Sequence, residues 1–385
     1  MKRKKLFCII FILIFIILFS VSGTYAQGSE NQNKGNETVF DIDKIAESLP
    51  QEIRDILPEG IDTLNETPEK ISELFSVEYI FDLSSGLLKT ALSAAIRTFA
   101  FIATVLLISS LISGVGNSFS QSGSGIRVWN LASSLCIAFC VYTLVGSHLK
   151  CVSEFSKNIV SFMRSLTVAM STVCISAGEI SSAGTNAAWS FLLTGSVEEM
   201  CDKLLIPIMQ ISFCATLTQS VTSGVNIGRF VQTIRNTFTS LLVFLMTVIS
   251  VILSFQSVIA HSTDSVAMRS VRYAITHSVP IIGGLVSDSA RTLASSFTLM
   301  KNSVGFFGVA VILVLSLYPL VGLFASKLAL QMGSAFSSVI NEDSASSFMD
   351  ESVKMINFLI AVTITVAVAF IFCVSVFAIF PASGA

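Results

Sequence analysis

Charged side chains are scarce in this chain. Of its 385 residues, 12% are charged and 52% are hydrophobic, and the mean hydropathy is +0.78. Soluble domains carry roughly 25% charged residues, so the composition excludes an ordinary water-soluble protein. It predicts a protein that is solvated largely by lipid.

Motifs of common enzyme classes are also missing. The chain contains no H-E-x-x-H zinc motif, no G-x-S-x-G nucleophile turn and no Gly-rich phosphate loop with its lysine. The three histidines, His148, His261 and His277, lack the spacing of ligands on one helix face, so each is interpreted as a polar contact. The sequence therefore predicts neither an enzyme nor a bound cofactor.

Residue clusters that bind metals or nucleic acids are absent as well. Cys8 lies near the N-terminus, and the other seven cysteines are scattered through apolar sequence. Cys136 and Cys140 lie one helical turn apart, but neither a second cysteine pair nor a histidine cluster accompanies them to complete a metal site. The cysteines are therefore interpreted as small apolar residues in helices buried in lipid. The basic residues are dispersed rather than clustered, so no nucleic-acid partner is predicted.

The charges that are present divide the chain into three parts. Residues 1–26 hold four basic residues and no acidic one, residues 27–82 hold 14 acidic against 4 basic, and the rest holds 15 basic against 11 acidic. The first part has the basic start, the apolar run and the small residues before Gln27 of a cleaved secretory signal. An uncleaved anchor helix is the alternative, and both would deliver the next segment outside the cytoplasm.

The acidic segment, residues 27–88, is predicted to be an extracytoplasmic region that is largely helical. Apolar residues recur at spacings of three and four after Phe40, and Thr67-Pro68-Glu69 has the cap, proline and acidic residue of a helix start. The segment is too short to build a large core alone. It is therefore expected to pack on a partner or on the membrane domain, unless it is only a solvated spacer.

Residues 89–385 are predicted to form an all-α polytopic membrane domain. A crossing helix needs about 20 mainly apolar residues. Six stretches meet this requirement, at approximately 90–113, 129–149, 204–222, 237–260, 304–330 and 355–380. Re-entrant segments would bring the total to about six to eight transmembrane or re-entrant helices.

Two stretches, 150–203 and 261–303, are too polar for lipid-facing helices and too apolar for ordinary loops. In each, an aromatic and a basic residue lead through small residues to a Ser- and Ala-rich segment. One interpretation is a duplicated unit, 129–222 and 237–330, as in transport proteins with broken helices around a central site. Coincidence of composition is the other. Counting Lys and Arg leaves the topology of both stretches open.

The stretch 261–303 carries charges that are costly beside a membrane unless they face protein, water or headgroups. Pro280 disfavours a continuous helix and Gly283-Gly284 permits a reversal. We therefore predict a re-entrant hairpin of two short helices that lines a water-filled path or an assembly surface, with an interfacial amphipathic helix as the alternative. The candidate residues are Asp264, Arg269, Arg272, His277, Pro280, Gly283, Gly284, Asp288, Arg291 and Lys301, with Arg164 and Glu179 in the other stretch. Asp288 and Arg291 are expected to pair on one helix face.

The region around this stretch is similar to a known protein family. Residues 254–309 contain Asp264-Ser265-Val266-Ala267 followed by Arg269, then Val279-Pro280, Gly283-Gly284, and Lys301-Asn302 with Gly305 and Gly308. This pattern resembles the signature region of stage III sporulation protein AE of endospore-forming bacteria. The leader, the acidic segment and the later helices match the layout of that family, so the resemblance covers nearly the whole chain, the first half by layout rather than by motif.

The resemblance implies a multi-pass protein of the mother-cell membrane that engulfs the developing forespore. Its partners would be other stage III sporulation proteins of a channel or secretion-like complex, with an ATPase supplying energy. Through that complex it would connect to a forespore membrane protein across the intermembrane space, in support of late forespore development. The resemblance implies no catalytic residues.

The residues themselves leave an alternative, which is an autonomous secondary transporter of a small solute. In that case Asp264, Asp288 or Glu179 would be the coupling carboxylate. The acidic outside segment favours the complex subunit, because a lone carrier has little use for it.

Overall fold

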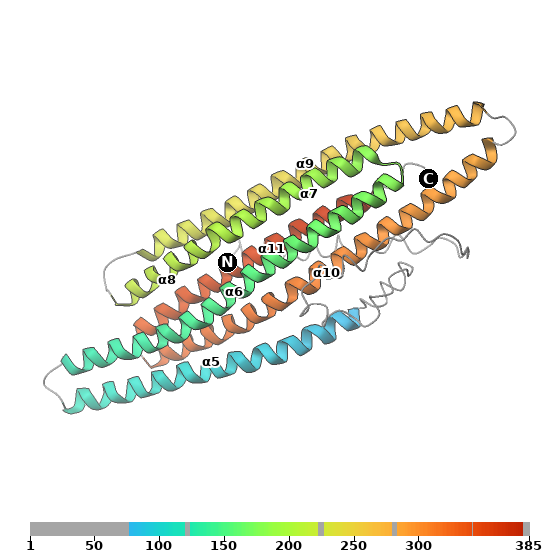
Figure 1. The fold of residues 1–385 in the computed structure, drawn as a ribbon. Helices are drawn as coiled ribbons and strands as arrows, with labels where there is room; N and C mark the ends of the chain where they lie inside the picture. The colour runs from blue at the N-terminus through green and yellow to red at the C-terminus, as the bar shows by residue number, and fades with distance from the viewer. Residues whose placement is uncertain (1–76, 120–123, 222–226, 279–282, 341, 380–385) are drawn as a thin grey trace. The chain divides into compact units, whose positions relative to one another are not determined.

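The computed structural model of the chain describes residues 77–119, 124–221, 227–278, 283–340 and 342–379. The helices are α5 (Val77–Phe119), α6 (Ser124–Ser176), α7 (Ile180–Met200), the π-helix η2 (Cys201–Leu205), α8 (Ile206–Val221), α9 (Ile227–Ser278), α10 (Gly283–Val339) and α11 (Asp343–Ile379) (Figure 1). No strand occurs in these ranges, which confirms the predicted all-α class. The predicted leader and the helix start at Thr67 lie outside the described residues.

Six helical segments are long and apolar enough to cross a membrane. They are Ser85–Ile112, Leu135–Ser176, Ile180–Thr218, Arg229–Ala267, Ser296–Val339 and Ala345–Ala378. Each of them overlaps one of the six predicted apolar stretches, so the chain is a multi-pass membrane protein. The helices themselves are much longer than a crossing requires: the 57 residues of α10 extend about 85 Å at 1.5 Å per residue.

The two polar stretches are not built from separate short helices. Residues 150–176 continue α6, and residues 180–203 lead through α7 into η2 and α8. The break predicted at 279–284 agrees with the end of α9 at Ser278 and the start of α10 at Gly283. The predicted short arms of a re-entrant hairpin are wrong, however, because these arms are the ends of long helices. Serine and threonine hydroxyls here donate to the carbonyl one turn earlier, as Ser262 does to Val258, so polar side chains do not interrupt the helix.

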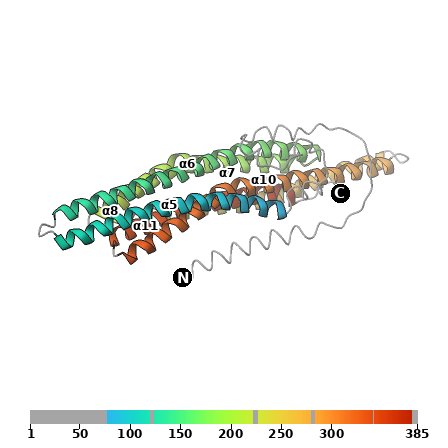
Figure 2. The same ribbon diagram turned by 90° about the horizontal axis from the view of Figure 1, so that it is seen from below.

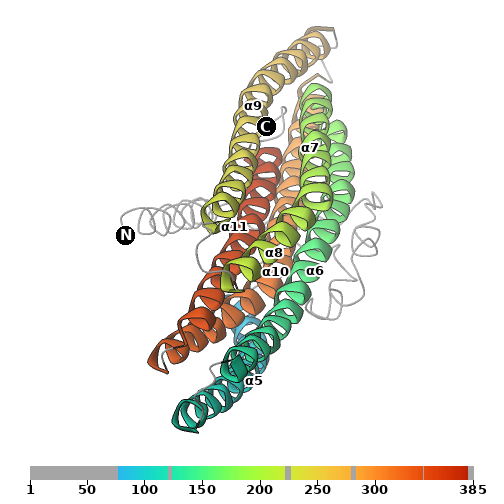
Figure 3. The ribbon, with the colours of Figure 1, turned by 90° about the vertical axis from the view of Figure 1, so that its left-hand side faces the viewer.

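α10 and α11 form the centre of the helical packing. They contact each other most extensively, and α10 also packs on α5 and α6 while α11 packs on α9, α6 and α8. In the most apolar part of each of these two helices, 61% of the residues are buried, against 22% in α5. In Figure 3, α10 and α11 run between α9 and α6, and Figure 2 shows α5 and α6 side by side.

Successive long helices run in opposite directions, with α7, η2 and α8 acting together as one descending helix (Figure 1). The connected ends of α6 and α7 therefore lie at the same end of the packing as those of α9 and α10. The connected ends of α5 and α6, of α8 and α9, and of α10 and α11 lie at the opposite end. Both polar stretches thus reverse direction on the same side.

Candidate functional site

Ionisable side chains from three parts of the chain meet near the start of α7. We name this set the α7 charge cluster, and it consists of Glu179 between α6 and α7, His261 and Asp264 on α9, and Lys301 on α10. The exposed fractions of Glu179, Lys301 and Asp264 are 0%, 3% and 6%. Such burial is rare for ionisable side chains unless they are paired, so the contacts among them determine what the cluster does.

The turn that positions Glu179 depends on Gly178. Gly178 has a φ of 84°, in the left-handed region that glycine adopts without steric cost. The Gly178 N–H donates to the Ile175 carbonyl at 3.0 Å, and the Glu179 N–H donates to the Cys174 carbonyl at 2.8 Å. These two hydrogen bonds form a Schellman motif, which satisfies the last carbonyls of α6. Glu179 is thereby fixed directly before α7.

Asp264 caps α7 from a neighbouring helix. Its carboxylate accepts hydrogen bonds from the backbone N–H groups of Ser181 at 3.0 Å and Ser182 at 2.8 Å. The first N–H groups of a helix have no partner within the helix, and they give its N-terminus a partial positive charge. The Glu179 side chain makes no capping bond of its own. The start of α7 is therefore held by α9.

Lys301 and His261 both approach the Glu179 carboxylate. Lys301 Nζ donates to Glu179 Oε2 at 2.8 Å, and His261 Nδ1 lies 3.7 Å from Glu179 Oε1. A buried carboxylate is costly unless it is paired and hydrogen-bonded, and the ammonium group meets that need. The cluster therefore joins the α6–α7 turn to α9 and α10.

A row of buried polar residues continues along α7 from the cluster. It consists of Glu179, Ser182, Asn186, Ser190 and Thr194. Their spacing of three and four residues puts them on one helix face. Ser190 Oγ lies 2.6 Å from Thr167 Oγ1 of α6. Ser182 Oγ and Asn186 Oδ1, with Ser257 Oγ of α9, are buried atoms that have no hydrogen-bond partner among the described residues.

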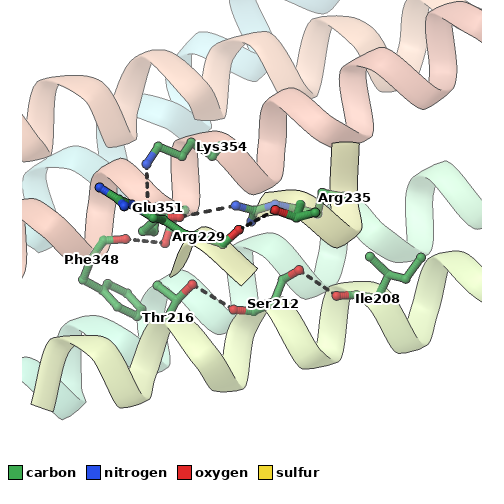
Figure 4. A network of polar contacts seen from close by, with 10 residues as sticks. Ile208, Ser212, Thr216, Arg229, Arg235, Phe348, Glu351 and Lys354 are labelled. Atoms are coloured by element: carbon green, nitrogen blue, oxygen red, sulfur yellow. Dashed lines mark hydrogen bonds and ion pairs between the residues drawn. The ribbon is translucent and has the colours of Figure 1, made fainter. Parts of the chain in front are cut away.

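A second buried ion pair lies on α9 and α11 (Figure 4). Arg235 Nη2 donates to Glu351 Oε2 at 3.3 Å, and Lys354 Nζ donates to Glu351 Oε1. The Arg235 side chain is 4% exposed, so its charge depends on Glu351. Figure 4 shows Ser212 and Thr216 of α8 nearby, and their hydroxyls donate to carbonyls of α8 itself.

Three of the predicted candidate residues, Glu179, Asp264 and Lys301, are thus in the α7 charge cluster. They come from both polar stretches. Arg164 lies elsewhere, on an exposed face, where it pairs with Glu198 of α7, and Arg269 is exposed on α9. Gly283 and Gly284 are the first two residues of α10. Pro280 and the side chains of Arg272, His277, Asp288 and Arg291 lie outside the described residues, so the pairing of Asp288 with Arg291 stays a prediction.

Sequence reasoning missed two features of these sites. The polar row on α7 could have been found from the recurrence of polar residues every three or four positions after Glu179. The Arg235–Glu351 pair had a weaker signal, because each residue only adjoins an apolar run and nothing in the sequence connects the two.

Comparison with known proteins connects this architecture to sporulation. The family model described as stage III sporulation protein AE matches residues 67–380, which include every described helix. The chain is 20% identical over 263 residues to stage III sporulation protein AE of Bacillus subtilis (strain 168), a match that covers 68% of this chain and 65% of that relative. No solved structure matches the chain. Because the family model covers far more than half of its length, the chain belongs to the stage III sporulation protein AE family.

Proposed function

We propose that the chain is a membrane subunit of a channel or secretion-like complex that connects the mother cell with the forespore and is required for late forespore development. Membership of a stage III sporulation family and six apolar helices support this proposal. The observation that carries it furthest is the α7 charge cluster, whose charges join three long helices. Such a cluster suits a rigid scaffold within a larger assembly.

The proposed location is the mother-cell membrane around the forespore. The proposed partners are the other stage III sporulation proteins in that membrane and, through them, a forespore membrane protein across the intermembrane space. The described helices expose many large apolar side chains, such as Phe139 at 71%, Phe244 at 66% and Phe255 at 68%. Surfaces of this kind require lipid or other subunits around them.

An autonomous secondary transporter is the second candidate, because carboxylates buried between membrane helices often couple transport to ions. Glu179 and Asp264 are such carboxylates. However, Glu179 already pairs with Lys301, and Asp264 already accepts two backbone hydrogen bonds. Because both have structural partners, the subunit is favoured over the carrier.

Native purification from sporulating cells tests the proposal. We expect several stage III sporulation proteins to copurify with the chain. Isolation of a homo-oligomer alone, which moves a solute into liposomes, would instead support the carrier.

A charge-removed variant separates the two candidates further. The double substitution Glu179→Gln with Lys301→Met removes both charges and keeps the side-chain volumes similar. A scaffold should then retain copurification and spore formation, whereas a carrier that couples through Glu179 should assemble but lose transport. Arg269→Met, at an exposed position of α9 outside the cluster, is the control.

A further inference from the structure

One exposed face of the molecule carries charge at a height where α9, α10 and α11 carry none. We name it the α6–η2 face. It consists of Lys150, Glu154, Lys157 and Arg164 on α6, Glu198 and Glu199 on α7, and Asp202 and Lys203 on η2. The face holds four basic and four acidic residues, so its formal charge is balanced.

Contacts between helices fix the height of this face. His148 Nε2 lies 2.6 Å from Ser326 Oγ of α10. A Cβ atom at Gly308 of α10 would lie 2.5 Å from Leu166 Cδ2 and 3.3 Å from Val374 Cγ1 of α11. Residues 148–166 of α6 therefore lie beside residues 308–326 of α10.

At this height α10 and α11 are free of charge. Residues 302–326 of α10 and 355–379 of α11 contain no Asp, Glu, Lys or Arg, and neither do residues 236–263 of α9. A run of 25 residues extends about 37 Å along a helix, which exceeds the roughly 30 Å of a hydrocarbon core. These three helices are therefore apolar over a full hydrocarbon thickness at the height of the α6–η2 face.

The two sides of the molecule differ sharply at this height. Phe238 of α9 packs on Phe358 of α11 with ring centroids 5.5 Å apart, and α9 then exposes Phe244 and Phe255, as lipid requires. On the α6–η2 face, the Lys157 side chain is instead 62% exposed and that of Lys203 is 70% exposed. A charged side chain at the centre of a bilayer costs about 2.5–3.5 kcal/mol or more, so contact of this face with hydrocarbon would be unfavourable.

Ion pairs within the face lower its charge but do not make it apolar. Arg164 pairs with Glu198, Lys157 lies 3.9 Å from Asp202, and Lys203 pairs with Glu199. Taking such a pair out of water still carries a desolvation penalty for both charged groups. Because the charges already have partners of opposite sign in the same chain, the face needs a solvent rather than a complementary charged surface.

We propose that several copies of this chain assemble with their α6–η2 faces turned toward a shared aqueous path, which solvates these charges inside the membrane. The inference rests on the proposed function and deepens it, because it assigns the lining of the conduit. A lining with equal numbers of both signs creates little net field, so it suits polar solutes of either charge. The π-helix η2 supplies Asp202 and Lys203 to this lining, and π-helical turns are frequent at functional sites.

Cysteine accessibility in membranes of sporulating cells tests the inference. In a full-length, cysteine-depleted chain, Lys157→Cys, Arg164→Cys and Lys203→Cys are compared with Phe244→Cys and Phe255→Cys at matching heights on α9. The controls are placed on α9 rather than on α5. Ala95 of α5 packs near Ala325 and Ala329 of α10, so α5 is displaced along the helix axis relative to the α6–η2 face. The probe is a charged, membrane-impermeant methanethiosulfonate. We expect modification on the face to be at least about tenfold faster, because the reactive thiolate forms only in water.

Two results would overturn the inference. Equally slow modification at all five positions would mean that protein or lipid covers the face. Equally fast modification on α9 would mean that this height lies outside the hydrocarbon core. Lys150→Cys and Glu154→Cys, which break none of the three ion pairs, provide the same comparison if the other variants fail to fold. Neither result would alter the copurification expected under the proposed function, so the two proposals fail separately.

Crosslinking between copies tests the shared path. A water-soluble bis-maleimide is applied to membranes that contain Lys157→Cys as the sole cysteine variant. We expect a crosslinked dimer of the chain, which the Phe244→Cys control should not give. Aqueous reactivity at residue 157 without any crosslink to a second copy would overturn the role of several copies.

Discussion

Glu179 and Arg164 each form an ion pair, but the two pairs contribute differently to stability because only Glu179 is buried. Glu179 is fully buried beside Lys301, whereas Arg164 and Glu198 are 48% and 44% exposed. Removing one partner of a buried pair leaves a charge without solvation, which costs about 3–5 kcal/mol. An exposed pair is worth about 0–1 kcal/mol because water solvates each partner alone.

A double-mutant cycle on Glu179→Gln and Lys301→Met should therefore show strong coupling. We expect each single variant to lose about 3 kcal/mol of unfolding free energy and the double variant to lose less than either. Denaturant unfolding in detergent measures these values. The same cycle on Arg164→Met and Glu198→Gln should give coupling below about 1 kcal/mol. Additive losses at Glu179 and Lys301 would contradict the assigned ion pair.

At the scale of elements, α7 depends on its neighbours for its first turn. The Asp264 carboxylate on α9 accepts hydrogen bonds from the N–H groups of Ser181 and Ser182, whereas the Glu179 side chain before α7 makes no capping bond. The α6–α7 reversal is thus completed by a helix that follows it in the chain.

Replacing Asp264 should open the start of α7. We expect Asp264→Ala to cost about 1–2 kcal/mol and to increase hydrogen exchange at the amides of Ser181 and Ser182. Asp264→Asn keeps one acceptor oxygen and should give an intermediate effect. Arg269→Ala, at an exposed position of the same helix, serves as the control. Unchanged exchange in Asp264→Ala would mean that another group holds the turn.

α10 approaches α6 and α11 closely at Gly308, one of the residues in the pattern that resembles the sporulation family. A Cβ atom there would lie 2.5 Å from Leu166 Cδ2, and Leu166 is itself buried. We expect Gly308→Ala to destabilise the fold by about 1–3 kcal/mol through overpacking.

Gly146 on α6 provides the comparison for this substitution. No atom lies within 4 Å of a Cβ placed there, so Gly146→Ala should be neutral or stabilise the helix by up to about 1 kcal/mol. Thermal unfolding of both variants in detergent measures the difference. Equal effects would argue against a close approach at Gly308.

At the scale of the whole molecule, the alternation of the described long helices predicts which helix ends share a side of the membrane, a question that charge counting had left open. The start of α7 and the end of α10 lie at opposite ends of the packing (Figure 1). Ile180 is 69% exposed and Val339 is 78% exposed, so both are suitable for labelling.

Cysteines at these two positions should label from opposite sides of the membrane. If the N-terminal leader acts as predicted, an impermeant maleimide should modify Ile180→Cys in intact protoplasts, and Val339→Cys only after permeabilisation. Labelling of both from one side would contradict the six crossings.

Sequence alone determined the features that depend on residues close to one another in the chain. Apolar runs of sufficient length predicted the six crossings, and Pro280 with Gly283 predicted the end of α9 and the start of α10. The cost of charge near a membrane also singled out Glu179, Asp264 and Lys301, although the same argument included Arg164, which lies on another face.

Only the tertiary structure decided which groups these side chains contact. Lys301 is 122 residues from Glu179 in the chain, and Asp264 is 82 residues from Ser182. Such pairs form when long helices pack in one register, and that register depends on side-chain volumes along the whole of α6, α9 and α10 rather than on any local pattern. For the same reason, the sequence could not show that the polar stretches continue as long helices or that charges from α6 and η2 gather on one face.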